Sequence, residues 1–177
     1  MKKALLFLGA AVSAASLYGA SVDWSAGSLA GAKDGDDLTA YTVYFIQDTT
    51  TAKVAEAIEA GTFGELANKS EGTITAKTNP RTGVTTYSAS GTATTTKTTD
   101  DGDYTSVLVM FTADGSSYTA MQKTTKVSEA TGTASFGFDG LGKSGTTSWA
   151  TTNVPEPVSA MLLLLGAAAF GLKRKIA

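Results

Sequence analysis

The sequence predicts a mainly β fold, in which a small antiparallel sheet or sandwich carries one packed helix. Three observations lead to this prediction. All 29 threonines lie between residues 39 and 152, and β-branched threonine favours the pleated, half-buried surface of a strand. Apolar runs over residues 39–47 and 104–113 have the length of strands. Only the segment 50–61 combines apolar residues at helical spacing with signals for both helix ends.

The remaining strand candidates are short and are separated by turn residues. The run 107–111 is continuously apolar, which predicts a strand covered on both faces. Residues 79–83, Asn-Pro-Arg-Thr-Gly, separate two threonine-rich stretches and predict a hairpin. A second hairpin turn is expected at 113–117, and a last short strand at 133–140.

The helix is expected to cover one face of the sheet. Thr50 or Thr51 can cap its N-terminus, and Gly61 suits the position after its last turn. The apolar residues that share one helical face are Val54, Ala55 and Ile58.

Composition excludes several classes of function. The formal net charge is -2, and residues 22–153 hold 9 Lys/Arg against 15 Asp/Glu, which gives -6. Nucleic acid is therefore not an expected partner, because phosphate backbones are bound by clustered basic side chains. The chain has no cysteine and no histidine, which removes disulfides, thiolate nucleophiles, histidine acid–base chemistry and the usual zinc ligands.

Two acidic clusters are the only candidates for metal or carboxylate chemistry. They consist of Asp34, Asp36 and Asp37 and of Asp100, Asp101 and Asp103. Neither cluster has the spacing of a calcium-binding EF-hand loop, and both are expected to be solvated turns, with calcium binding left open. An exposed turn gives no reason for the raised pKa that a general acid needs. We therefore expect no enzyme, no catalytic residue, no metal and no cofactor.

Aromatic side chains leave a second function open, because exposed aromatic rings can stack on sugars. The same side chains are also typical of the edges of a hydrophobic core. The candidates are Trp24, Trp149, Tyr41, Tyr44, Tyr87, Tyr104 and Tyr118.

The N-terminus has the layout of a secretory signal peptide over residues 1–21. Lys2 and Lys3 precede an apolar run over 4–15, and small residues follow. The run is shorter than the roughly 20 residues of a spanning helix. Export through the Sec translocon is expected. The predicted cleavage region consists of Gly19, Ala20 and Ser21.

The C-terminus combines a stiff strip, an apolar helix and a basic tip. Residues 158–172 carry no charge and reach about 22 Å as a helix, so they span a bilayer only where it thins. The basic residues that hold the tail end (173–177) in the cytoplasm are Lys173, Arg174 and Lys175. Pro155 and Pro157 force Val154 and Glu156 toward extended geometry.

The order of Val154-Pro155-Glu156-Pro157, apolar helix and basic tip over residues 154–177 resembles the PEP-CTERM sorting signal of Gram-negative bacteria. This resemblance covers about 25 residues. It implies that an exosortase, a membrane cysteine protease and transpeptidase, processes the chain as its substrate in cells that make exopolysaccharide. The basic tip departs slightly from the family, whose members often have more arginine.

These observations divide the chain into four parts. We expect a signal peptide over 1–21, a β-rich extracellular domain over 22–139, a Gly/Thr/Ser linker over 140–153 and the sorting signal over 154–177. Within the domain, residues 90–103 lack apolar periodicity and are expected to form a mobile loop.

The expected function follows from this organisation. The protein would be non-enzymatic and exported. It would be held in the inner membrane as an intermediate and would then move to the cell surface or exopolysaccharide matrix, where it would have a structural or interaction role. Exopolysaccharide is then a further candidate partner. The alternative is a carbohydrate-binding surface module or adhesin sorted by the same tail.

Overall fold

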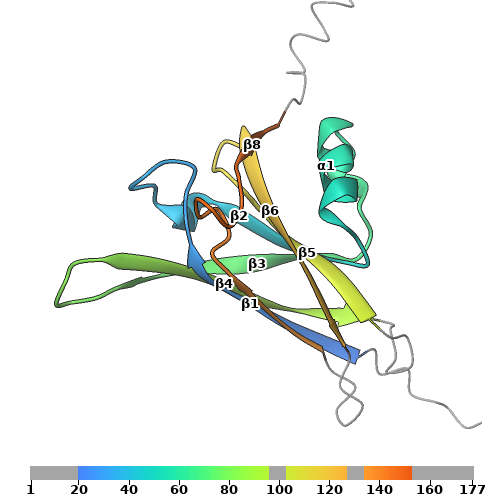
Figure 1. Ribbon diagram of the computed structural model, residues 1–177, viewed down its shortest axis with the longest axis horizontal. Helices are drawn as coiled ribbons and strands as arrows, with labels where there is room; N and C mark the ends of the chain where they lie inside the picture. Colours follow the sequence, from blue (N-terminus) through green and yellow to red (C-terminus); the bar gives the residue numbers. More distant parts are fainter. Residues whose placement is uncertain (1–19, 96–102, 127–133, 153–177) are drawn as a thin grey trace, which may run out of the picture.

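The computed structural model describes residues 20–95, 103–126 and 134–152, and it is mainly β (Figure 1). Eight strands form one sheet in the order β7-β1-β4-β3-β2-β5-β6-β8. The strands are β1 (Ala20–Leu29), β2 (Thr42–Gln47), β3 (Lys69–Thr78), β4 (Thr85–Thr95), β5 (Asp103–Phe111), β6 (Ser117–Lys126), β7 (Ala134–Asp139) and β8 (Ala150–Thr151). The helices are α1 (Thr51–Glu59) and the 3₁₀ turns η1 (Leu38–Ala40) and η2 (Phe63–Glu65).

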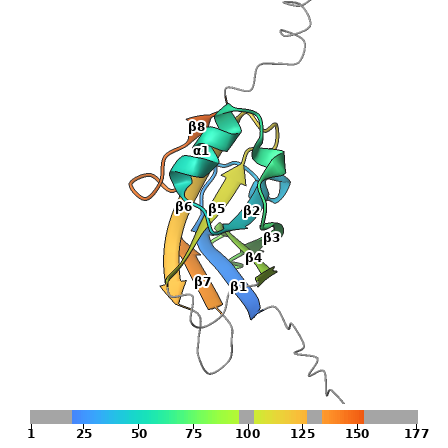
Figure 2. The ribbon, with the colours of Figure 1, turned by 90° about the vertical axis from the view of Figure 1, so that its right-hand side faces the viewer.

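The sheet is antiparallel in every pair except one, because β7 runs parallel to β1. It curls until β6 and β7 lie side by side (Figure 2). There the Lys123 ammonium donates a hydrogen bond to the Gly137 carbonyl across the two strands. The result is one curled sheet with its core inside the curl.

Alternation along the strands fills this core. In β1, Val22, Trp24 and Ala26 point inward and are buried, whereas the residues between them are partly or fully exposed. The Trp24 ring stacks on Phe45 of β2 with ring centroids 5.7 Å apart. Phe136 of β7 also packs edge-on against Phe45, at 5.3 Å. These ring contacts therefore connect β1, β2 and β7 inside the curl.

Two glycines make room for the Trp24 indole. An ideal Cβ placed on Gly72 would lie 2.1 Å from the indole ring, and one placed on Gly91 would lie 2.7 Å from it. Gly72 is in β3 and Gly91 is in β4. The tryptophan therefore fills space that any larger residue at either position would occupy.

A second apolar layer lies outside the curl, where α1 covers β2, β5 and β6 (Figure 2). Val107 and Val109 face Val54 and Ile58 of α1, while Leu108 belongs to the core inside the curl. The run 107–110 is completely buried. This confirms the predicted strand with both faces covered.

The helix forms as its local sequence predicts. Thr50 is the N-cap, and its hydroxyl accepts a hydrogen bond from the Lys53 backbone N–H at 3.4 Å. Gly61 follows the last turn with φ of +71°, a left-handed conformation that glycine adopts without strain. The buried face includes Ala57 in addition to Val54 and Ile58, while Ala55 is half-buried.

Both predicted hairpins are present, over the turns between β3 and β4 and between β5 and β6. The expected strand over 39–47 begins only at Thr42, because Asp37 caps a 3₁₀ turn over Leu38–Ala40. Strand β1, which we did not predict, includes Ala20 and Ser21 of the expected cleavage region. Their partners in β4 are Thr95 and Thr94.

Two segments differ from their predicted states. Residues 90–95 of the expected mobile loop belong to β4, where small side chains pair with β1, and residues 96–102 lie outside the described ranges. Residues 140–152 of the expected linker are packed onto the domain. Leu141 is fully buried and Trp149 packs against the core. The domain described by the structure therefore extends to Thr152.

Candidate functional site

The last described segment folds back tightly onto the sheet. The Ala30 N–H donates to the Leu141 carbonyl at 3.0 Å, and the Gly140 N–H donates to the Gly27 carbonyl at 3.1 Å. The Trp149 indole N–H donates to the Gly142 carbonyl at 3.2 Å. Backbone and side-chain hydrogen bonds thus hold this segment, although its sequence is rich in glycine.

Strand β8 holds the chain to the sheet up to Thr152. β8 pairs with the start of β6. The Thr152 N–H donates to the Ser116 carbonyl at 2.9 Å, and the Thr152 hydroxyl donates to the Gly115 carbonyl at 2.7 Å. The predicted sorting strip begins two residues later, at Val154.

Most of the predicted site residues lie outside the described ranges. These are Gly19, Val154, Pro155, Glu156, Pro157, Lys173, Arg174 and Lys175. Within the ranges that the structure describes, no helix has the length and hydropathy of a membrane span. The apolar stretch 158–172 is not among those residues.

A hollow with aromatic walls lies beside Thr152, with a volume of about 560 Å³. We call it the aromatic hollow. Its rings are Tyr44 of β2, Phe63 of η2 and Phe111 of β5. The Phe63 centroid lies 5.5 Å from that of Tyr44 and 4.9 Å from that of Phe111, both edge-on. All three rings are half-buried, so they offer apolar surface without being part of the closed core.

Lys69 supplies a positive charge to the aromatic hollow. Its ammonium lies over the Phe63 ring, 4.8 Å from the centroid, and 5.3 Å from that of Tyr44. It donates to the carbonyls of Phe63 and Gly64, both at 3.2 Å. An ammonium has three N–H groups, and two of them have acceptors among the residues that the structure describes, which leaves one for another acceptor. Burial, with a smaller contribution from the Glu71 carboxylate, raises the pKa of Tyr44.

Asp114 is an anionic group in the lining of the aromatic hollow, in the turn between β5 and β6. One of its carboxylate oxygens accepts from the Thr112 hydroxyl at 2.6 Å and from the Ser116 hydroxyl and N–H at 2.8 and 3.0 Å. These hydrogen bonds favour the ionised form. They lower the pKa of Asp114 from 3.8 to about 2.

We predict that this turn is sensitive to acid. Because the pKa of Asp114 is lower in the folded chain, its contribution to stability is complete above about pH 4 and is lost as the pH falls through about 2. NMR titration of the Asp114 carboxyl carbon should give a midpoint near 2. Replacing Thr112 with valine removes the hydrogen bond that lowers the pKa of Asp114 most, and should move the midpoint toward 3.8. An unchanged midpoint would contradict this explanation.

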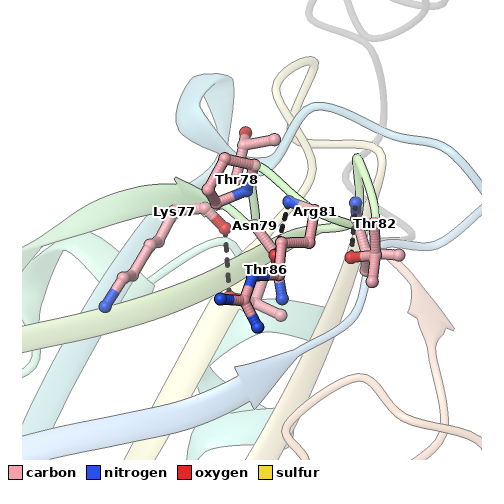
Figure 3. A pocket seen from close by; sticks show the side chains of 8 residues that line it. Lys77, Thr78, Asn79, Arg81, Thr82 and Thr86 are labelled. Atoms are coloured by element: carbon pink, nitrogen blue, oxygen red, sulfur yellow. Dashed lines mark hydrogen bonds between the residues drawn. The ribbon is translucent and has the colours of Figure 1, made fainter.

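A second hollow, of about 790 Å³, lies at the tip of the β3–β4 hairpin (Figure 3). The Arg81 N–H donates to the Asn79 side-chain oxygen at 2.9 Å, and the Thr86 hydroxyl donates to the Lys77 carbonyl at 3.2 Å. Val84, also in its lining, is 57% exposed. All of its lining residues belong to this one projecting hairpin (Figure 1). It is therefore the surface of a turn and not a cleft between elements.

Two described residues of the acidic clusters, Asp36 and Asp37, have local structural contacts. Asp36 accepts a hydrogen bond from the Tyr41 hydroxyl, which is the main reason that its pKa is lowered. Asp37 caps the turn at Leu38–Ala40. Asp103 opens β5, and Asp100 and Asp101 lie outside the described ranges. Among the residues described, no group of three or more acidic side chains is placed to hold a metal ion.

The aromatic candidates divide by burial. Trp24, Tyr104 and Tyr118 are buried and offer no platform for a sugar ring. The half-buried candidates are Tyr41, Tyr44, Tyr87 and Trp149. Sequence reasoning missed Phe63, Phe111 and Lys69 as parts of a site, because they come from three different elements that no local pattern connects.

Comparison with known proteins finds no match for this chain among protein-family models, curated proteins or solved structures.

Proposed function

We propose that this chain is a non-enzymatic, exported protein that an exosortase sorts to the cell surface or exopolysaccharide matrix. One observation carries the proposal. The core of the described fold lies between the two predicted processing signals, since its buried residues in β1 include Val22 and Trp24, and the last hydrogen-bonded residue of the described C-terminal segment is Thr152. A domain with these limits can lose both terminal signals and keep its core.

Removal of the signal peptide costs the sheet little on this proposal. Cleavage near Ala20 or Ser21 leaves Val22, Trp24 and Ala26 in the mature chain, and these residues are buried in β1. The part of the core that they supply is therefore kept. The described fold is therefore compatible with the proposed cleavage.

The strip over 154–157 would serve as the recognition segment of the sorting enzyme. Its prolines keep it extended, so an enzyme can bind it without first unfolding a helix. The helix 158–172 would hold the chain in the inner membrane until the tail is cut. The Sec translocon and the exosortase are thus the proposed partners, and the chain would be in the inner membrane only transiently.

A role in a hydrated matrix is supported by the outer face of β1, β4 and β3. The side chains opposite the core on these strands are mostly hydroxyls, and they are exposed on β3 and β4. They include Ser25, Thr73, Thr75, Thr86, Ser88, Ser90, Thr92 and Thr94. Such a face can exchange hydrogen bonds with water and with polysaccharide hydroxyls. The alternative of a carbohydrate-binding module has less support, because three of its seven aromatic candidates are buried.

Cell fractionation with and without the sorting protease tests this proposal. We expect the mature protein in the surface fraction when the protease is present, and a longer precursor in the inner membrane when it is absent. A protease with its catalytic cysteine replaced is the matched control and should behave like the deletion. Equal amounts of surface protein in all three strains would refute sorting by this enzyme.

A further inference from the structure

We propose that the aromatic hollow binds the chain's own strip, residues 154–157, with Glu156 beside Lys69. The binding itself needs no sorting enzyme. Its consequence for sorting, given below, rests on the proposed function.

The end of the described chain places the strip within reach. Thr152 is part of the lining of the aromatic hollow and is anchored to Gly115 and Ser116 at the β5–β6 turn. Glu156 follows four residues later, and in an extended proline-rich conformation four residues cover about 12 Å. The chain therefore leaves the domain at one side of the hollow with enough length to cross it.

The walls of the aromatic hollow suit a proline-rich segment. Proline-rich strips bind grooves lined by aromatic rings, because their extended conformation is already formed and little entropy is lost. Tyr44, Phe63 and Phe111 supply such rings from three elements. The strip offers Val154, Pro155 and Pro157 as apolar contacts.

Charge fixes the direction of the strip. Glu156 is the only charged residue between positions 153 and 172, and Lys69 has one N–H that no acceptor in the described part of the chain occupies and that can bind a carboxylate. Asp114, on the turn that anchors Thr152, repels a second carboxylate at that side. Glu156 is therefore expected to lie away from Asp114 and next to Lys69.

Binding of the strip would withhold the sorting motif from the enzyme until the two separate. Replacing Lys69 with methionine keeps the motif intact, removes the ammonium that faces Glu156, and removes the hydrogen bonds to the Phe63 and Gly64 carbonyls in the wall of the hollow. Both losses weaken the binding. In cells with the protease, this variant should therefore lose its tail faster than the natural chain. The aromatic hollow would then set the rate at which the precursor is processed.

Disulfide trapping in the purified full chain, solubilised in detergent, tests the binding directly. The chain has no cysteine, so a pair made by Val158→Cys, just after the strip, and Gly64→Cys is the only one present. A side chain at Gly64 meets no atom within 4 Å, so this change should not disturb the fold. Val158→Cys with Ser88→Cys, exposed on the outer face of β4, is the matched control pair.

The decisive comparison adds Glu156→Gln to each pair, because a short tether alone already brings residue 158 near Gly64. We expect this change to slow trapping at Gly64 about threefold or more and to leave the Ser88 pair unchanged. An equal rate at Gly64 with glutamate and glutamine would overturn the proposal. The experiment contains no protease, so its failure would leave the sorting proposal intact, and failure of sorting in cells would leave this result intact.

Discussion

Replacing Gly72 with alanine is expected to lower the free energy of unfolding by about 3 kcal/mol. The new methyl group would lie 2.1 Å from the Trp24 ring, much closer than any real contact. Trp24 cannot retreat freely, since it is buried and stacks on Phe45. A loss of this size is a large part of the roughly 5–15 kcal/mol that stabilises a typical domain.

Urea unfolding of the two proteins, followed by circular dichroism, measures this loss. Gly64→Ala is the matched control, because its added methyl group meets no atom within 4 Å. The control should stay within about 0.5 kcal/mol of the natural chain. Equal stability of Gly72→Ala and Gly64→Ala would show that Trp24 is not packed as described.

Replacing Glu156 with alanine is expected to reduce the processed fraction of the protein at least tenfold in cells. The strip keeps both prolines and its extended shape, but it loses the one carboxylate that the enzyme can bind. The variant also loses the proposed contact with Lys69, and that loss alone would speed processing. We expect the loss of recognition to dominate, and Lys69→Met separates the two effects.

Immunoblots of the precursor and mature forms measure this change. Glu56→Ala, at an exposed glutamate of α1 that is not part of the lining of the aromatic hollow, is the matched control, since it removes a carboxylate from the folded domain and leaves the strip unchanged. Processing of Glu156→Ala at the natural rate would remove most of the support for the motif.

Local signals predicted the local structure. Thr50 caps the start of α1 and Gly61 follows its end, so both signals lie next to the helix in the sequence. The turn residues at 79–83 likewise define one hairpin. The unbroken apolar run 107–111 predicted a strand with both faces covered, because apolar and polar residues do not alternate along it and neither face is polar.

Long-range contacts explain what the sequence did not predict. Strand β1 follows the signal-like segment directly, and only Val22, Trp24 and Leu29 are large apolar residues in it. Its parallel pairing with β7 joins segments more than 100 residues apart. The glycine-rich segment 140–152 resembles a linker, yet Leu141 and Trp149 hold it through partners near residues 30 and 41. The aromatic hollow likewise depends on such pairing.

The most direct test of sorting is the mass of the C-terminal peptide of the protein isolated from the cell surface. We predict a mature chain that ends at or before Pro157, with residues 158–177 removed. The same peptide from cells without the protease should keep those residues. Surface protein that still carries residues 158–177 would contradict the proposed function.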